Sequence, residues 1–215
     1  MCGRFVLFTT AEALIQATGQ LIDAPGRALH APVGTPGPRY NIAPTQVIPI
    51  VRFNSPSEAV LEPARWGLLP HWKKDLDGPP LFNARAETVQ SKPSFRDAFK
   101  RGRCLIPLDG YYEWKDKQPY FVSRDDAALL WATGLDQLSC TMVTTDAPEP
   151  MEQLHHRLPR FLSADEVEQW LLGEPDEAAE LLHPSQSSLV EHLRIRPADK
   201  AVGNVRNDYP ELISQ

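Results

Sequence analysis

The chain opens with "MCGRF", so a cysteine directly follows the initiator methionine. Removal of Met1 would leave Cys2 with a free α-amine and a thiol on adjacent carbons. Such a 1,2-aminothiol can close a ring on an aldehyde, a reaction that no internal cysteine offers. Position alone favours a frayed and inert terminal residue. The other residues capable of chemistry therefore have to decide whether Cys2 is functional.

A glutamate lies among aromatic residues in the stretch "GYYEW". Side chains of a strand alternate between its two faces, so Tyr111 and Glu113 are expected on one face and Tyr112 and Trp114 on the other. Desolvation on the first face would raise the pKa of Glu113 toward neutrality, as a general acid working near pH 7 requires. The alternative is an ordinary glutamate on a solvated strand face.

Two polar stretches add further candidates. "LHHRLP" places His155 and His156 before Arg157, and a histidine there could shuttle protons, contact an oxyanion or make only a structural hydrogen bond. "FNARAET" places Asn83, a hydrogen-bond donor and acceptor, near Arg85, whose guanidinium suits bidentate binding of phosphate. Structural roles fit both stretches as well, so neither decides the function alone.

Tryptophans flank a glycine and a proline in "RWGLLPHW". Trp66 or Trp72 could present an indole on which a nucleobase stacks. Core packing is the expected role of at least one of them.

Length and charge limit the classes of function. The 215 residues suffice for one buried core, and we expect a single domain over residues 1–215. No run approaches the roughly 18 apolar residues of a membrane span, so we expect no membrane association. The formal net charge of −6 argues against a protein that coats duplex DNA with a broadly basic surface, but it permits a local basic groove.

The cysteines indicate a reducing compartment. Cys2, Cys104 and Cys140 cannot form a complete disulfide framework, and the N-terminus lacks the basic-then-apolar pattern of a secretory signal. A cytoplasmic protein is therefore expected. The chain has no Cys-x-x-Cys pair, and His155 and His156 are its only histidines close in sequence, so we expect no metal site and no cofactor.

Short strands with helices at the edges are predicted along the chain. A helix is expected over 9–19, with Thr9 and Glu12 at capping-box spacing and Gly19 as its stop, and 23–39 is predicted to be a loop. Ser163 and Glu166 predict a second capping box for a helix ending before Gly173. Strands are predicted within 47–53, 59–70, 103–115, 119–124, 128–135 and 140–145. Residues 81–89 are predicted to be a strand end or a loop that leads to a short helix over 94–102, and another short helix is predicted over 176–183. This order predicts an α+β domain, a curled, barrel-like antiparallel sheet with short peripheral helices.

Seven blocks occur in a fixed order over nearly the whole chain. They are "MCGRF", "RYNIAPTQ", "RWGLLPHW", "FNARAET", "RCLIPLDGYYEW", "HHRLP" and "AVGNVRN". The set resembles the SRAP family, the abasic-site-processing proteins that cross-link themselves to damaged single-stranded DNA. The resemblance includes the required cysteine at position 2.

The resemblance implies a role for each matching residue. Cys2 would be the nucleophile, Asn83 would orient the reacting sugar and the N-terminal amine, Glu113 would be the acid and base, and His155 would act on the opened sugar. The residues expected to bind DNA are Arg4, Arg85 and Arg157 on phosphates, and Asn41, Pro44 and Trp72 at the cleft.

The resemblance also implies the reaction and the partner. The partner would be single-stranded DNA containing abasic sites, bound by a monomer that is nucleoid-associated when on DNA. The product would be a thiazolidine cross-link between Cys2 and the ring-opened sugar. Self-removal of Met1 by a peptidase-like activity and a weak lyase activity would accompany it, although a housekeeping aminopeptidase could also remove Met1.

Two other classes of function stay open from the residues. An N-terminal-nucleophile amidohydrolase, such as a glutaminase, can also begin Met-Cys-Gly, but the other six blocks do not resemble that family. A non-catalytic single-strand-binding module built from arginines and tryptophans leaves the position of Cys2 unexplained.

Overall fold

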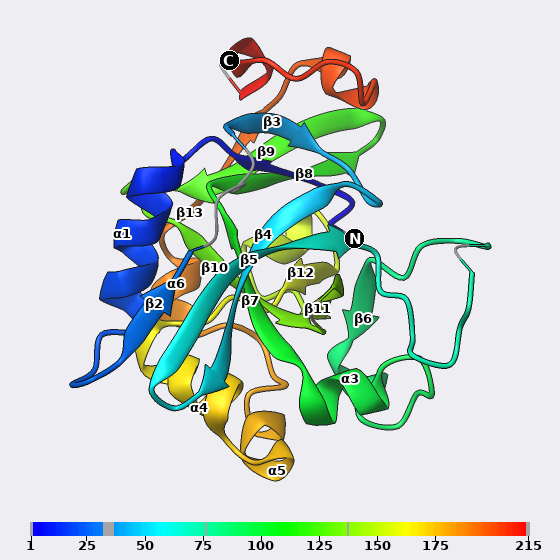
Figure 1. Ribbon diagram of the computed structural model, residues 1–215. Helices are drawn as coiled ribbons and strands as arrows, with labels where there is room; N and C mark the ends of the chain where they lie inside the picture. Colours follow the sequence, from blue (N-terminus) through cyan, green and yellow to red (C-terminus); the bar gives the residue numbers. More distant parts are fainter. Residues whose placement is uncertain (1, 32–36, 76, 137, 214–215) are drawn as a thin grey trace.

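The computed structural model describes residues 2–31, 37–75, 77–136 and 138–213. Two sheets of short strands form the body of the molecule, and helices lie at its periphery (Figure 1). The smaller sheet has the strand order β13-β9-β8-β1-β3, and the larger has the order β12-β11-β10-β7-β4-β5-β2, with β6 beside β11. The strands are β1 (Arg4–Leu7), β2 (Ala28–His30), β3 (Arg39–Ile42), β4 (Val47–Ser55), β5 (Glu58–Trp66), β6 (Asn83–Arg85), β7 (Arg103–Leu108), β8 (Gly110–Lys115), β9 (Gln118–Arg124), β10 (Leu130–Leu135), β11 (Ser139–Asp146), β12 (Arg157–Pro159) and β13 (Leu193–Pro197).

A ring of strands closes within the larger sheet, because β11 pairs with β10 on one side and with β5 on the other. Most pairs are antiparallel, and the parallel ones are β11 with β5, β11 with β6, and β2 with β5. The α+β prediction with a curled sheet is confirmed, in the form of a ring of strands that is not a true barrel.

The helices are short apart from the first. The α-helices are α1 (Ala11–Leu21), α2 (Ala86–Val89), α3 (Arg96–Arg101), α4 (Val167–Leu172), α5 (Pro175–Ala179) and α6 (Ser187–Val190), and the 3-10 turns are η1 (Met151–Gln153), η2 (Ala164–Glu166), η3 (Lys200–Gly203) and η4 (Pro210–Ile213). Among the described residues, no helix is long and apolar enough to cross a membrane.

The start of α1 differs from the prediction. Thr10, and not Thr9, caps the helix by accepting a hydrogen bond from the Ala13 N–H at 3.3 Å. The Thr9 hydroxyl instead donates to Asp109 at 2.6 Å. The helix also runs past Gly19 to Leu21, because a glycine costs a helix only about 1 kcal/mol and packing overrides it.

Two strand boundaries also differ. The predicted loop over 23–39 contains β2 and the first residue of β3, while residues 32–36 lie outside the described part of the chain. The predicted strand over 103–115 is divided at Asp109 into β7 and β8, which belong to different sheets. The Asp109 carboxylate accepts the backbone N–H groups of Phe8 and Thr9, so the chain is fixed where it passes between the sheets.

The late helical segment begins with the predicted capping box. Ser163 and Glu166 form both of its hydrogen bonds. The first turn, η2, is a 3-10 helix that continues as α4. The helix predicted over 176–183 is shorter and is present as α5.

The core lies in two clusters separated by the smaller sheet. The main cluster contains Phe5 and Tyr111, and the second contains Val6 and Tyr112 on the opposite face of the same strands. The predicted alternation along β8 is therefore confirmed. Residues Ala198, Val202 and Leu212 cover the outer cluster. We call residues 198–213 the C-terminal cap, which lies at the top of Figure 1.

Asn41 fastens the C-terminal cap to the sheet. Its side chain is fully buried, and its Nδ2 lies 3.1, 3.1 and 2.7 Å from the carbonyl oxygens of Val202, Asn204 and Asn207. Its Oδ1 accepts a hydrogen bond from Arg4 at 2.9 Å. The sequence blocks "RYNIAPTQ" and "AVGNVRN" are thus structural partners.

Replacing Asn41 with alanine should destabilise the protein. The change removes the donor to the carbonyl groups of Asn204 and Asn207 and the acceptor of Arg4, while the Val202 carbonyl keeps Arg4, so we expect a loss of about 1–3 kcal/mol in the free energy of unfolding. Urea unfolding measures this loss. Asn54→Ala, at an exposed asparagine of β4, is the matched control and should change it by about 0.5 kcal/mol or less. Equal losses in the two variants would contradict the role given to Asn41.

Candidate functional site

Cys2 is buried in the main core cluster although it is the second residue. It precedes β1, an interior strand between β8 and β3, and its side chain is 1% exposed. Asn83 Nδ2, from the start of β6, donates to the Cys2 carbonyl oxygen at 2.7 Å. This bond joins residues 81 positions apart in the chain. Cys2 is therefore held in place and is not a frayed terminal residue.

The Cys2 thiol is kept protonated by its surroundings. Burial raises the pKa of this thiol to about 12, and the nearby charge of Glu113 adds to the effect. The sulfur also lies 3.8 Å from the Arg4 carbonyl oxygen, a weak hydrogen bond. At neutral pH the thiol therefore needs a base before it can act as a nucleophile.

Glu113 occupies the face of β8 that points to the main core. It is 6% exposed, and Tyr111 shares its face as predicted. Its negative charge contributes to raising the pKa of Cys2 and of Tyr111, whose own pKa is raised first by burial. Glu113 and Cys2 are consequently electrostatic neighbours, and Tyr111 is a third member of this cluster that the sequence did not indicate as functional.

His155 completes the cluster. Its Nδ1 accepts a hydrogen bond from the Arg157 backbone N–H at 2.9 Å, so its neutral ring carries the proton on Nε2. Burial lowers the pKa of His155, an effect that the charge of Glu113 opposes. The exposed ring of His156 stacks on it at a centroid distance of 4.3 Å. The electrostatic interaction with Glu113 places His155 near that carboxylate.

The Arg157 guanidinium is buried in a carboxylate network. Its Nη1 donates to Glu87 at 2.5 Å and to Asp146 at 2.7 Å, and its Nη2 donates to the Thr144 carbonyl at 2.5 Å. Arg157 is 7% exposed. Both terminal nitrogens are committed to protein acceptors, an arrangement that offers no support for the predicted phosphate contact. The network instead ties α2 and β11 to the segment that carries His155.

Two further predicted DNA ligands lie away from the cluster. Arg4 points to the outer face of the smaller sheet, where its Nη1 donates to Asn41 and to the Val202 carbonyl at 2.7 Å. Asn41 is fully buried under the C-terminal cap. Their contacts are structural, and the prediction that they bind DNA gains nothing from this geometry.

The other predicted DNA ligands reach the surface. Arg85 is exposed two residues after Asn83, and Trp72 is 56% exposed on the loop between β5 and β6. Pro44 is half-buried. A pocket of about 590 Å³ beside the cluster is lined by Asn83, Arg85, Thr88, Ser91, Lys92 and Phe95. The structure thus brings together Cys2, Asn83, Glu113 and His155, with Arg85 at the edge.

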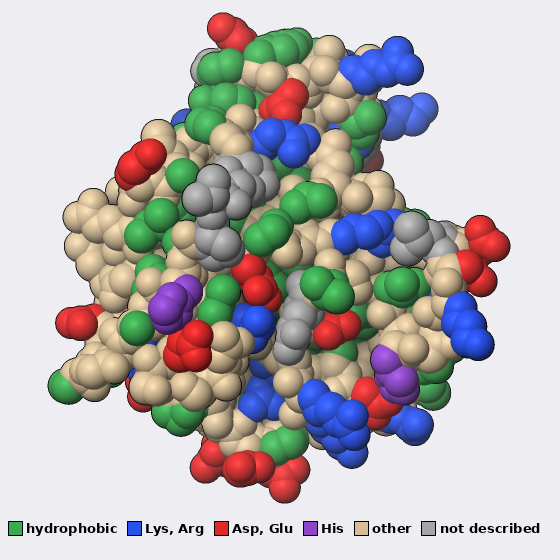
Figure 2. All heavy atoms as spheres, in the orientation of Figure 1, with side chains coloured by type: hydrophobic (Ala, Val, Ile, Leu, Met, Phe, Trp, Pro, Cys, Tyr) green, Lys and Arg blue, Asp and Glu red, His purple; other side chains and the backbone are tan. Residues whose placement is uncertain are grey.

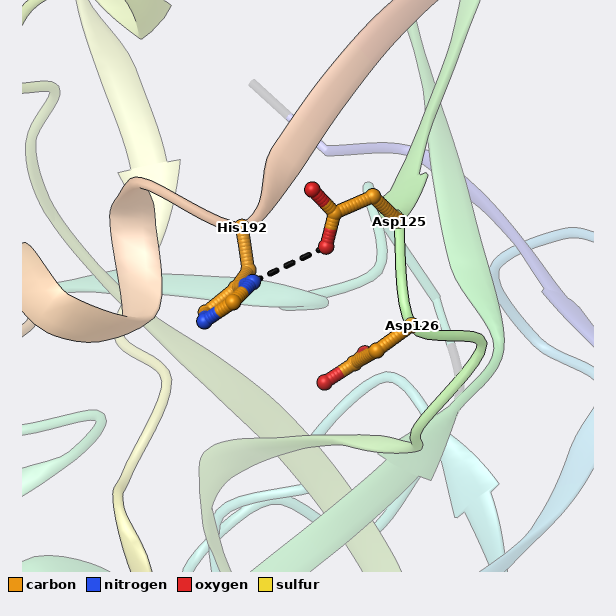
Figure 3. A group of neighbouring side chains, drawn as sticks. All are labelled: Asp125, Asp126 and His192. Carbon is orange, nitrogen blue, oxygen red and sulfur yellow. Dashed lines mark hydrogen bonds and ion pairs between the residues drawn. The ribbon is translucent and has the colours of Figure 1, made fainter.

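A group of metal-ligating residue types lies elsewhere on the surface. Asp125, Asp126 and His192 point toward one another, with His192 Nδ1 2.9 Å from Asp125 (Figure 3). Both carboxylates already have cationic partners, because Arg194 pairs with Asp125 and Arg124 pairs with Asp126. Ion pairing explains the group, and we assign no metal to it.

Comparison with known proteins identifies the family. The model of the family described as SOS response associated peptidase (SRAP) matches residues 1–205. The chain belongs to the SRAP family. It is 35% identical to the abasic site processing protein YoqW of Bacillus subtilis, with 99% of both chains covered. It is 30% identical to YedK of Escherichia coli, again over 99% of both, and 30% identical to HMCES of Gallus gallus, over 99% of this chain and 77% of the relative.

Solved structures share the SRAP fold of this chain. A crystal structure of a protein from Bacteroides thetaiotaomicron matches with a TM-score of 0.76 and 21% identity, covering 100% of this chain and 99% of the other. A protein from Bordetella bronchiseptica matches with a TM-score of 0.74, over 92% of this chain and 100% of the other. At 21% identity these two matches bear on the fold alone.

The Glu87–Arg157 pair should make stability depend on pH. The hydrogen bond from Arg157 lowers the pKa of Glu87 below its ordinary value of 4.5. A carboxylate with a depressed pKa contributes stability above its unfolded-state pKa and loses it as the pH falls through the folded-state value. Glu87 is half exposed, so Glu87→Gln should cost about 1 kcal/mol or less between pH 6 and 8 and progressively less below about pH 4.5.

Urea unfolding of wild type and Glu87→Gln at pH 7 and at pH 4 measures this difference. Glu152→Gln, at an exposed glutamate of η1, is the control and should show little difference at either pH. A cost of Glu87→Gln that grows as the pH falls would contradict the assigned pair.

Proposed function

We propose that this protein processes abasic sites: it binds single-stranded DNA and forms a thiazolidine cross-link between Cys2 and the ring-opened sugar. One observation carries the proposal, namely that the residue behind Met1 is a cysteine buried beside Glu113 and held by Asn83. The relatives named abasic site processing proteins support the same substrate. A glutaminase or a simple binding module gains no comparable support.

The first step is attack by the Cys2 α-amine on the sugar aldehyde. Once Met1 is removed, an α-amine with an ordinary pKa near 7.8 is roughly a quarter to a third neutral at pH 7.4. A lysine amine, with a pKa near 10.4, is neutral about once in a thousand. The amine adds to the carbonyl carbon, and loss of one water gives the imine.

The second step is addition of the thiol to the imine carbon. The C–S bond closes the five-membered ring, and the proton leaving sulfur is balanced by the proton gained at nitrogen. Because burial holds the pKa of the resting thiol at about 12, a base has to take that proton. Glu113 is the buried carboxylate whose charge acts on Cys2, so we assign it the transfer. Such a group contributes about 10²- to 10⁴-fold in typical enzymes.

Asn83 and His155 would position the reactants. The Asn83 amide holds the Cys2 carbonyl, and its buried Oδ1 has no hydrogen-bond partner among the described residues, so that it can accept from the freed amine. His155, with its proton on Nε2, would donate to an oxygen of the opened sugar.

Two companion activities follow from the same chemistry. Hydrolysis of the Met1–Cys2 peptide bond by water would expose the amine, either by self-processing at this site or by an aminopeptidase. An imine that does not close its ring could lose the 3′ phosphate by β-elimination, which would give a weak lyase activity.

A gel assay with abasic single-stranded DNA tests the proposal. The processed protein should form an adduct that survives heating in denaturant, and a tag that stays on the N-terminus should abolish it. Cys2→Ala, with removal of Met1 confirmed by mass spectrometry, should lose this adduct and keep an imine that borohydride traps. A heat-stable adduct formed by processed Cys2→Ala without reductant would show that Cys2 does not close the ring.

Glu113→Gln should slow cross-linking and leave DNA binding nearly unchanged. The substitution keeps the shape of the side chain and removes the group that exchanges a proton, so we expect at least about a tenfold lower rate between pH 6 and 8. Single-turnover cross-linking measures the rate. Wild-type kinetics of the variant over this pH range would reduce Glu113 to a structural role.

A further inference from the structure

Arg196, on β13, has no carboxylate partner among the described residues. The chain has 28 acidic residues against 22 lysines and arginines, and Figure 2 shows both kinds of side chain interspersed over one face of the molecule. Arg124 follows this pattern, because it pairs with Asp126. The side chain of Arg196 differs, since its Nη2 donates to the Ser123 hydroxyl at 3.0 Å. An arginine whose charge is left unpaired in this way is a candidate ligand for an anion.

A pocket of about 370 Å³ lies beside Arg196, on the face of the smaller sheet that carries the outer core cluster. Strand pairing sets Arg196 opposite Phe121 of β9, and Phe121 belongs to that outer cluster. Cys2 belongs to the main cluster, on the other face of the sheet. The pocket is therefore separate from the candidate site.

Small residues make room for this pocket. Gly110 of β8 lies directly opposite Ser123 of β9. A Cβ atom at Gly110 would lie 2.5 Å from the Phe121 ring, so only glycine lets the ring lie against β8. The Arg196 guanidinium lies over the same ring, 5.5 Å from its centroid. The ring and the Ser123 hydroxyl thus hold the guanidinium at the pocket by two contacts.

Arg196 and Ser123 together offer hydrogen-bond donors to an anion. The Ser123 hydroxyl accepts from Nη2 of Arg196, so its own proton is left to donate. Within the described part of the chain, Nε and Nη1 of Arg196 have no hydrogen-bond acceptor. A carboxylate matches this set of donors, because its two oxygens can accept from the flat guanidinium and from the hydroxyl together.

Two carboxylates also line the pocket, and both already have partners. Asp109 accepts hydrogen bonds from the backbone N–H groups of Phe8 and Thr9, at 2.7 and 2.8 Å. Asp125 pairs with Arg194. The charge of Arg196 is therefore the one that no carboxylate of the described lining offsets.

The other walls of the pocket are apolar. Phe8 and Ile213 line it together with Ala127, from the turn between β9 and β10. Phe8 is 37% exposed, and its ring stacks on Tyr40 at a centroid distance of 5.7 Å. An inorganic phosphate would leave these walls in water, whereas an aromatic body would cover them. The volume lies near the lower end of the range of about 300–1,000 Å³ that is typical of small-molecule sites.

We propose that this pocket binds a carboxylate attached to an aromatic body. The carboxylate accepts hydrogen bonds from Arg196 and Ser123, and the aromatic body packs between Phe8 and Ile213. A free aromatic acid and the last residue of a peptide present the same chemistry. The site does not depend on the proposed reaction at Cys2, because it lies on the other face of the smaller sheet.

NMR titration of the ¹⁵N-labelled protein tests the site with N-acetyl-phenylalanine and its neutral amide. The two probes have the same shape and differ in the charge that Arg196 would bind. The acid should shift the backbone signals of residues around Ser123 and Arg196, and the amide should bind at least about fivefold more weakly. N-acetyl-Ala-Ala-Phe separates the two sources: tighter binding than the single residue assigns the site to a peptide end, and equal or weaker binding assigns it to a free acid.

Two variants divide the contribution of charge from that of the wall. Arg196→Gln should weaken binding of the acid at least about fivefold and leave binding of the amide unchanged. Phe8→Ala should weaken both probes by a similar factor, because the ring covers the aromatic body and not the charge. Arg206→Gln is the control, at an exposed arginine of the C-terminal cap outside the pocket, and should change neither.

The spectrum of each variant reports whether it is folded. If Arg196→Gln does not fold, the wild type still decides the question, because added salt should weaken binding of the acid and not of the amide. Equal affinities for the acid and the amide would overturn the proposal. So would the absence of shifts up to the solubility limit of the acid, or shifts that gather around Arg85 and Lys92 instead of Arg196.

Discussion

One hydrogen bond, from the Asn83 amide to the Cys2 carbonyl oxygen, joins the N-terminal segment to β6 at the candidate site. It fixes the carbonyl of the residue that precedes β1, in a part of the chain where N-termini commonly fray. The fold supports this bond from both sides. β1 is an interior strand of the smaller sheet, and β6 is fixed by parallel pairing with β11, with Asn83 opposite Met142. The position of Cys2 therefore depends on strands from distant parts of the chain.

The two faces of β1 and β8 contact different parts of the molecule: one faces the candidate site and the other faces the C-terminal cap. Tyr111 and Glu113 face the main core and Cys2, whereas Tyr112 faces the C-terminal cap. Arg4, on the cap side, binds Asn41 and the Val202 carbonyl. The segment "MCGRF" thus contains a cysteine at the candidate site and, two residues later, an arginine that holds the C-terminal cap. Proximity in the sequence does not imply that the two residues share a site.

Sequence patterns correctly predicted those features of the structure that depend on interactions between residues close together in the chain. The alternation along β8 and the capping box of Ser163 depend on backbone geometry within a few residues, and both are present. The division of the strand at Asp109 could not be predicted, because it results from hydrogen bonds to Phe8 and Thr9, about 100 residues away. For the same reason the hydrogen bonds from the Arg157 guanidinium to Glu87 and Asp146 could not be predicted, because they join residues that are distant in the sequence. Arginine is a good phosphate ligand only where its donors are left to the solvent.

Burial of the nucleophile determines the order of events in the proposed reaction. A thiol whose pKa is raised to about 12 is a poor nucleophile at neutral pH. The α-amine, which is partly neutral at that pH, would have to react first, and the imine it forms holds the sugar carbon beside the sulfur. Glu113 then needs to take the thiol proton only after the substrate is attached. Burial keeps the Cys2 thiol protonated and unreactive by itself. In the proposed reaction the thiol would therefore react only with an aldehyde that the α-amine has already bound as an imine.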